Sequence, residues 1–71
     1  MTTAEVIEVL GFANGNERAV HLVLADGSGV TGIPASVDLH PTAFEVYLHP
    51  LGDDDTEIAL PLTAIRSAEL V

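Results

Sequence analysis

Short runs in which apolar and polar residues alternate at period two most strongly constrain the fold of this chain. In the run 43–49, Phe44, Val46 and Leu48 share one face of an expected strand, and polar residues take the other. The run 57–62 alternates in the same way, and the acidic stretch between the two runs has the composition of a solvated turn. Because a strand pair with one apolar face is only marginally stable alone, the rest of the chain must cover it.

Two further segments in the first half of the chain predict strands. The segment 18–24 alternates cleanly and is followed by Asp-Gly at 26–27, a strong hairpin signal because glycine supplies the positive φ of primed turns. The next segment, 30–39, changes phase beside Gly32 and Pro34. Proline cannot donate to a strand ladder, so this change predicts a bulge or a sharp bend.

The two ends of the chain carry weaker patterns. In the segment 4–12, the β-branched residues and the following Asn-Gly at 13–16 favour a strand and hairpin. The apolar spacing there also fits a helical stripe, so a short N-terminal helix is the alternative. Near the other end, residues 61–65 predict a tight turn of 3₁₀ type before a last strand at 66–71.

These elements predict an all-β fold: one small, strongly bent antiparallel barrel or roll of five or six strands that spans residues 1–71. A chain of 71 residues supports one small domain. It contains no cysteine, so neither disulfides nor a zinc–thiolate site can add stability. Such a small core makes self-association a natural supplement.

The charge balance argues against two classes of partner. The formal net charge is −9, and Arg18 and Arg66 are the only strongly basic residues. Contacts to phosphate backbones rest on lysine and arginine, so we expect neither nucleic acid nor anionic membranes as partners. The acidity is explained by solubility or habitat, or by attraction to a basic protein. No signal peptide and no membrane-length apolar run is visible, which predicts a cytoplasmic protein.

The spacing of the turn residues resembles a known family. Leu24-Ala25-Asp26-Gly27, then Gly32 five positions later and Asp38 six positions after that, resemble the first motif of Sm-like proteins. The closing strands of that fold resemble the pattern of Ile58, Leu60, Ile65 and Leu70. SH3-like barrels share the bent strands and the 3₁₀ turn. The resemblance implies a five-stranded bent barrel that assembles by pairing its Phe44 strand with the last strand of the next copy.

The same family binds RNA, but the residues that the resemblance assigns to this role differ here. Thr42 stands near the position of the family's RNA-binding asparagine. Residues 62–64 offer no counterpart of the Arg-Gly or Lys-His pair of the second motif. The resemblance therefore supports the fold but not the RNA-binding site, because fold alone does not determine function.

Candidate catalytic and metal-binding residues are few. His21 and His49 are expected on the outer face of neighbouring strands, where Glu45 would be a third ligand, but the spacing matches no metal motif. Exposed, solvated histidines are the favoured interpretation, and His40 belongs with them. The acidic stretch 52–57 lacks the ligand spacing of a calcium loop. No serine has a nucleophile motif, so we expect neither an enzyme nor a cofactor.

The outer face and the strand edges remain as candidate interaction sites. Tyr47 lies opposite the apolar face of its strand and either anchors an interface or packs across strands. The strand 43–49 has no internal proline, so we expect it to be the free edge at which copies pair. We predict a non-catalytic protein-interaction or self-assembling module, with Sm-like RNA binding as the alternative. The candidate interaction residues are Phe44, Glu45, Tyr47, His49 and His21.

Overall fold

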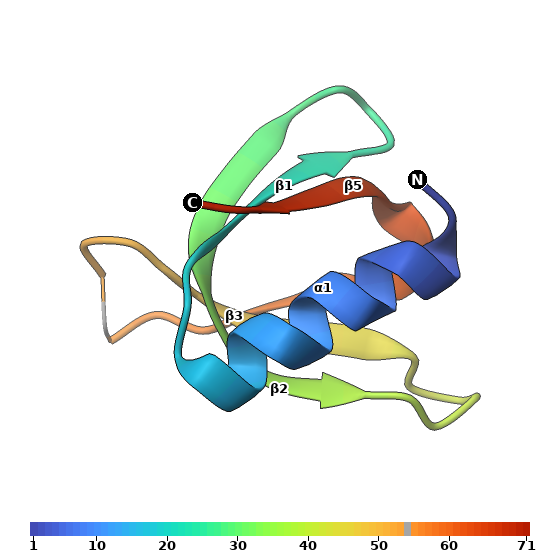
Figure 1. Ribbon diagram of the computed structural model, residues 1–71, viewed down its shortest axis with the longest axis horizontal. Coiled ribbons are helices and arrows are strands. Elements are labelled where there is room, and N and C mark those ends of the chain that lie inside the picture. The colour runs from blue at the N-terminus through green and yellow to red at the C-terminus, as the bar shows by residue number, and fades with distance from the viewer. Residues whose placement is uncertain (54) are drawn as a thin grey trace.

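The computed structural model describes residues 1–53 and 55–71. In this part of the chain one helix precedes five strands, and a 3₁₀ helix separates the last two (Figure 1). The elements are α1 (Thr3–Asn16), β1 (Val20–Leu24), β2 (Gly29–Asp38), β3 (Glu45–Pro50), β4 (Ile58–Pro61), η1 (Leu62–Ala64) and β5 (Ile65–Leu70). The strands form one antiparallel sheet in the order β4-β3-β2-β1-β5. The fold is mostly β, as expected, with one helix added.

The first element is a helix, so the expected strand at 4–12 and hairpin at 13–16 are wrong, and the helical alternative is correct. The Thr2 hydroxyl accepts a hydrogen bond from the Glu5 N–H at 3.2 Å, and the Glu5 carboxylate accepts from the Thr2 N–H at 2.8 Å. This reciprocal capping box satisfies amide donors that a helix start leaves free. The helix residues that are buried recur at helical spacing: Val6, Leu10 and Ala13.

The helix α1 packs against the inner face of the curved sheet. Figure 1 shows β2 curving past the helix, with β1 and β5 on one side of the molecule and β3 on the other. The core cluster joins helix, strands and 3₁₀ turn: Val6, Leu10, Ala13, Val20, Leu22, Val46, Leu48, Leu62, Ile65 and Ala68. Removing this apolar surface from water is the main favourable term in folding.

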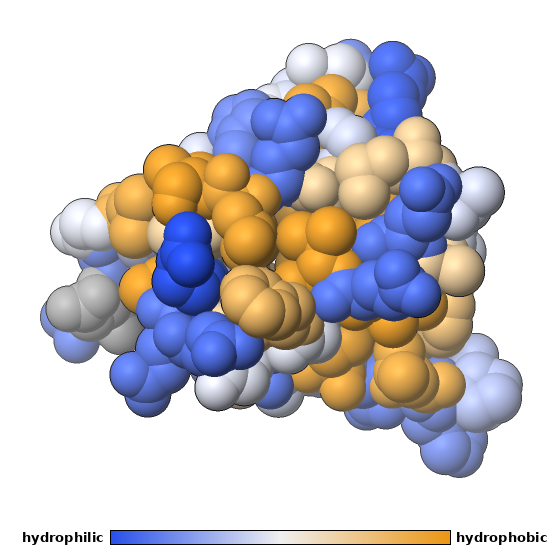
Figure 2. Space-filling view, viewed as in Figure 1, coloured by the Kyte–Doolittle hydropathy of each residue, from blue (hydrophilic) through white to orange (hydrophobic). Residues whose placement is uncertain are grey.

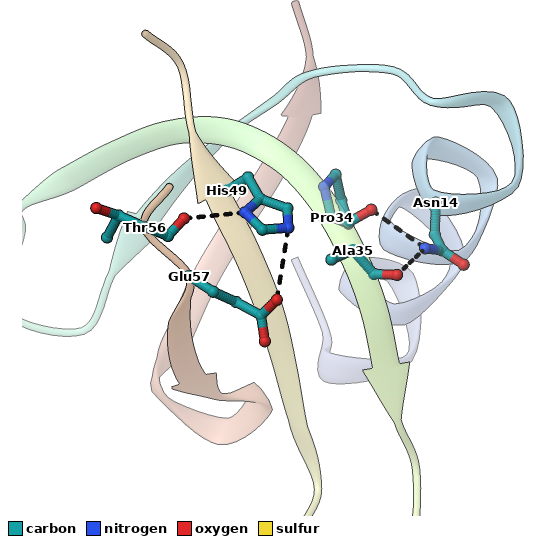
Figure 3. A network of polar contacts seen from close by, with 6 residues as sticks. All are labelled: Asn14, Pro34, Ala35, His49, Thr56 and Glu57. Atoms are coloured by element: carbon teal, nitrogen blue, oxygen red, sulfur yellow. Dashed lines mark hydrogen bonds and ion pairs between the residues drawn. The ribbon is translucent and has the colours of Figure 1, made fainter. Parts of the chain in front are cut away.

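The strand β2 bends at a bulge, as its change of phase predicted. Its register against β3 shifts just after Pro34. The Asn14 side chain of α1 donates from Nδ2 to the carbonyl of Pro34 at 3.1 Å and to that of Ala35 at 2.9 Å (Figure 3). A bulge disrupts the regular ladder, and Asn14 supplies donors to two carbonyls at this bend. The helix and the bend are thereby held together.

Both predicted tight turns are confirmed. In the β1–β2 hairpin, Gly27 has φ +88° and its N–H donates to the Leu24 carbonyl at 2.9 Å. This is the positive φ for which the Asp-Gly pair was expected. The 3₁₀ turn η1 (Leu62–Ala64) lies where it was predicted, and Ile65 after it is 5% exposed. These turns connect β1 to β2 and β4 to β5.

The edges of the sheet differ from the expectation. Because β3 pairs with β2 on one side and β4 on the other, the prediction that the strand 43–49 forms a free edge is wrong. In the described part of the chain, β4 and β5 are each paired on one side only, and the sheet does not close into a barrel. Asp54, in the expected acidic turn, lies outside the described residues.

Candidate interaction surface

The strand β3 separates a buried face from an outer face. Val46 and Leu48 are fully buried, whereas Glu45, Tyr47 and His49 between and beside them are only partly buried. The side chains of successive strand residues point to opposite faces, so these last three lie on the outer surface. The alternation read from the sequence is confirmed here.

Phe44 has a different place from the other candidate residues. It precedes β3, adopts a left-handed backbone with φ +45°, and packs its partly buried ring against the core. Its carbonyl accepts a hydrogen bond from the Leu62 N–H at 3.0 Å. Phe44 therefore joins β3 to the 3₁₀ turn from the inside.

Tyr47 is surrounded by carboxylates. Its hydroxyl donates to Glu45, which precedes it by two positions on the same face of β3. Glu45 raises the pKa of Tyr47 above its usual value, first by accepting this hydrogen bond and then by its charge; burial and the charges of Asp38 and Glu57 add to the shift. Asp38 of β2 stands directly opposite Glu45 in the strand register. The Tyr47 ring thus lies on a negatively charged part of the sheet.

His49 connects β3 to the segment that leads into β4 (Figure 3). Its Nδ1 donates to the Thr56 carbonyl at 2.9 Å, because a carbonyl oxygen only accepts. Its Nε2 lies 3.4 Å from a carboxylate oxygen of Glu57. Protonation of Nε2 would give both ring N–H groups an acceptor. His49 is therefore placed to hold this segment against β3.

The three histidines do not converge. The strand β2 lies between β1, which carries His21, and β3, which carries His49, so the expected neighbouring placement of these two is wrong. His21 Nδ1 lies 2.7 Å from the Thr31 hydroxyl, and His40 Nδ1 lies 2.7 Å from the Thr42 hydroxyl. Among the described residues, no group of His, Cys, Asp and Glu side chains is arranged to hold a metal, and no pocket opens.

The two arginines do not neutralise the carboxylates around Tyr47. Arg66 donates to the Ala25 carbonyl at 2.9 Å, and its charge acts on Asp26 in the β1–β2 turn. Arg18 is exposed beyond the end of α1. Within residues 1–53 and 55–71, neither arginine forms an ion pair with a carboxylate. The negative charge on the outer face of β2 and β3 is therefore left without a cation from this chain.

The free edge of β4 follows from its pairing. The Leu62 N–H donates to the Phe44 carbonyl. Hydrogen-bonded pairs alternate in an antiparallel ladder, so Leu60 and Ile58 bond to β3, while Ala59 and Pro61 direct their backbone groups outward. Pro61 has no N–H. The edge of β4 therefore offers one donor, the Ala59 N–H, and the carbonyls of both outward residues.

The free edge of β5 follows from the same reasoning. The Val71 N–H donates to the Ala19 carbonyl at 3.1 Å, so the alternate residues Ala68 and Leu70 direct their backbone groups away from β1. The Ala68 N–H donates to the Met1 sulfur at 3.4 Å, a weak acceptor. Met1 thus covers the edge of β5 at Ala68. The outward backbone groups of Leu70 are the other part of this edge.

The face that carries α1 has apolar side chains at its surface. Figure 2 shows apolar groups between the helix and the C-terminal end of β5. Phe12 of α1 is 52% exposed, and Leu70 and Val71 at the end of β5 are 42% and 65% exposed. Leu70 and Val71 add apolar area to the surroundings of the β5 edge, where an interface would bury them.

No protein-family model matches the chain, and no curated protein matches it. Among the described residues, no helix has the length and apolar character needed to cross a membrane.

Sequence reasoning identified part of this surface. Glu45, Tyr47 and His49 were placed on the outer face from their alternation alone. The contributions of Asp38 and Glu57 were missed, because their proximity to Tyr47 depends on the registers of β2 with β3 and of β3 with β4. The edge at β4 was missed, and the edge at the last strand was implied only by the family resemblance, because strand order is a long-range property. The placement of β2 between the strands that carry His21 and His49 was missed for the same reason.

Proposed function

We propose that this protein is a non-catalytic protein-interaction module, built as a strongly bent sheet of Sm-like or SH3-like type, that assembles with copies of itself through β4 and β5. The observation that carries the proposal is the strand order, which leaves one side of β4 and of β5 unpaired in the described part of the chain. Unpaired backbone donors and acceptors at a sheet edge are a template for strand addition.

The local features support this type of fold. The sheet has five antiparallel strands, β2 bends at a bulge, and the 3₁₀ helix η1 lies between β4 and β5. These are the features that the sequence resemblance implies. The function does not follow from the fold alone, so the edges and their chemistry must carry it.

The two edges favour a head-to-tail arrangement. They lie at opposite ends of the strand order, so β4 of one copy can pair with β5 of the next while both remain in their own sheets. An interface between two different surfaces of the same chain closes into a ring or extends as a filament. Pro61 limits the number of bonds that β4 can offer, which keeps the interface short.

Charge opposes this assembly. Each copy carries a formal net charge of −9, so copies repel one another at low ionic strength. Salt screens this repulsion over a Debye length of about 10 Å at 0.1 M. We therefore expect assembly to strengthen as salt rises, which is the opposite of the behaviour of a nucleic-acid complex.

The test is the solution mass by light scattering, at low and moderate salt, for the wild type and two variants at one position. Ala59→Pro removes the outward N–H of β4 without breaking a bond to β3, because Ala59 is a non-hydrogen-bonded position. Ala59→Thr keeps the N–H and is the matched control. We expect multiples of 7.4 kDa for the wild type and Ala59→Thr, and the single-chain mass for Ala59→Pro.

A wild type that stays at 7.4 kDa at every salt concentration, or an Ala59→Pro variant that assembles like the wild type, contradicts the proposal.

A mobility assay with single-stranded RNA at low salt tests the Sm-like alternative. Tight RNA binding that weakens with salt would favour that alternative.

A further inference from the structure

The outer face around Tyr47 combines an aromatic ring with carboxylates from three neighbouring parts of the sheet. Asp38 ends β2, Glu45 begins β3, and Glu57 immediately precedes β4. All three act electrostatically on the Tyr47 hydroxyl. Because Glu45 and Tyr47 are two positions apart on one strand and Asp38 is opposite Glu45, this arrangement is fixed by the sheet itself.

The arrangement costs stability within the chain. Like charges directly opposite each other on neighbouring strands are destabilising, and Asp38 faces Glu45 with neither arginine paired to them in the part of the chain that the structure describes. A cation supplied from outside would convert this repulsion into attraction. The face therefore has a charge that is complementary to a basic partner and not to a second copy of this acidic chain.

The carboxylates are held in place and retain acceptor capacity. Asp38 accepts from the His40 N–H at 2.9 Å, and Glu45 accepts from the Tyr47 hydroxyl. Glu57 lies beside His49. An ionised carboxylate has about four lone-pair sites, so each group can accept further hydrogen bonds without losing the contact that orients it.

We propose that this face, formed by Asp38, Glu45 and Tyr47 with Glu57 at its rim, docks an arginine-bearing segment of a basic protein partner. The planar guanidinium has five donors, which suits two adjacent carboxylates, and it stacks on aromatic rings. A cation over an aromatic face gains further attraction. Lysine has the charge but not the planar fork. The site rests on the proposed role as a protein-interaction module, but not on assembly through β4 and β5.

The test measures fluorescence anisotropy of labelled hexa-arginine and hexa-lysine with the full chain at neutral pH and low salt. The two peptides carry the same charge, so they separate guanidinium recognition from general attraction to an acidic protein. We expect the wild type to bind hexa-arginine about threefold or more tightly than hexa-lysine. Tyr47→Leu removes the ring and is expected to abolish this preference.

A pair of double variants separates the site from net charge. Asp38→Asn with Glu45→Gln and the control Glu8→Gln with Glu69→Gln each remove two of the chain's negative charges. Glu8 on α1 and Glu69 on β5 are exposed and form no hydrogen bond or ion pair through their side chains among the described residues. We expect hexa-arginine to bind about tenfold more weakly to the first variant and less than about twofold more weakly to the control.

The stability of the variants and the pattern of peptide binding decide whether the proposed arginine site is correct. The amides keep acceptors for the His40 N–H and the Tyr47 hydroxyl, so the urea midpoint of the first variant should equal or exceed that of the wild type. Equal weakening in both double variants, no preference for arginine, or no binding by the wild type would overturn the proposal. A wild type that assembles but does not distinguish the peptides would refute this site and leave the proposed function standing.

Discussion

The two faces of β3 have opposite chemical characters. On the inner face, Val46 and Leu48 are fully buried within an apolar cluster. On the outer face, Glu45 faces Asp38 across the strands and accepts from the Tyr47 hydroxyl. The inner face thus removes apolar surface from water, whereas the outer face holds like charges close together. The same six-residue strand carries both.

This difference indicates that the inner face of β3 supplies stability, whereas its outer face is suited to recognition. A small domain has a net stability of about 5 kcal/mol. Substitutions of buried residues on its inner face can therefore remove a large part of that stability. The outer face contributes little to folding. It also keeps Asp38 opposite Glu45, although this repulsion between two carboxylates lowers stability. Residues that oppose stability at a defined position are candidates for function. Substitutions on the two faces should therefore have different effects.

The largest effect is expected for Leu48→Ala on the inner face. Leu48 is fully buried, and truncating a buried leucine costs about 2–5 kcal/mol through lost transfer energy and a residual cavity. Urea denaturation followed by circular dichroism measures the change. Its neighbour on the outer face provides the control: Tyr47→Leu should cost less than about 1 kcal/mol. Equal losses at the two positions would remove the distinction between the faces.

A smaller effect is expected where α1 meets the bend of β2. Asn14→Ala removes donors from the Pro34 and Ala35 carbonyls, which should cost about 1–2 kcal/mol. Asn16→Ala is the matched control, because Asn16 bonds only to the Phe12 carbonyl of its own helix at 2.8 Å. Its expected cost is less than about 0.5 kcal/mol. If the two variants unfold at the same urea concentration, Asn14 does not stabilise the bend.

The interface between helix and bend also marks where sequence reasoning failed. The pair Asn14-Gly15 is a common hairpin turn, yet α1 continues through it to Asn16, and the C-cap Glu17 has a left-handed backbone with φ +53°. Sequence reasoning overlooked the spacing of Thr2 and Glu5, which form a capping box and favour the start of a helix. Packing of the apolar stripe against the sheet then outweighs local turn preference.

The strands were more predictable than their order. Alternation located the apolar faces, and turn-forming residues located the Asp-Gly turn and η1, because these features depend on residues close in sequence. The pairing of β3 with β4 across the acidic turn was expected and is confirmed, but β3 also pairs with β2, and no local pattern shows that both of its sides are occupied. The candidate surface divides in the same way: Tyr47 was identified from its own strand, whereas Asp38 was not.

The smallest effect tests the outer face directly through the titration of Tyr47. The hydrogen bond to Glu45 and the charge of Glu45 raise the pKa of Tyr47 above its ordinary value of 10.0, and burial and the charges of Asp38 and Glu57 add to the shift. A group whose pKa is raised by folding stabilises the native state below its unfolded pKa. This contribution is lost as pH rises through the folded pKa. Tyr47 should therefore favour folding at neutral pH and cease to do so above pH 10.

Ultraviolet absorbance of tyrosinate gives the measurement without ambiguity, because the chain has a single tyrosine and no tryptophan. The midpoint should lie above that of the urea-unfolded chain. Glu45→Gln should lower the midpoint, since the amide lacks the charge that opposes ionisation, and Glu8→Gln on the exposed surface of α1 should leave it nearly unchanged. If Glu45→Gln leaves the midpoint in place, the Tyr47 hydroxyl does not bond to Glu45 in solution. The outer face would then lack the fixed carboxylate on which arginine docking depends.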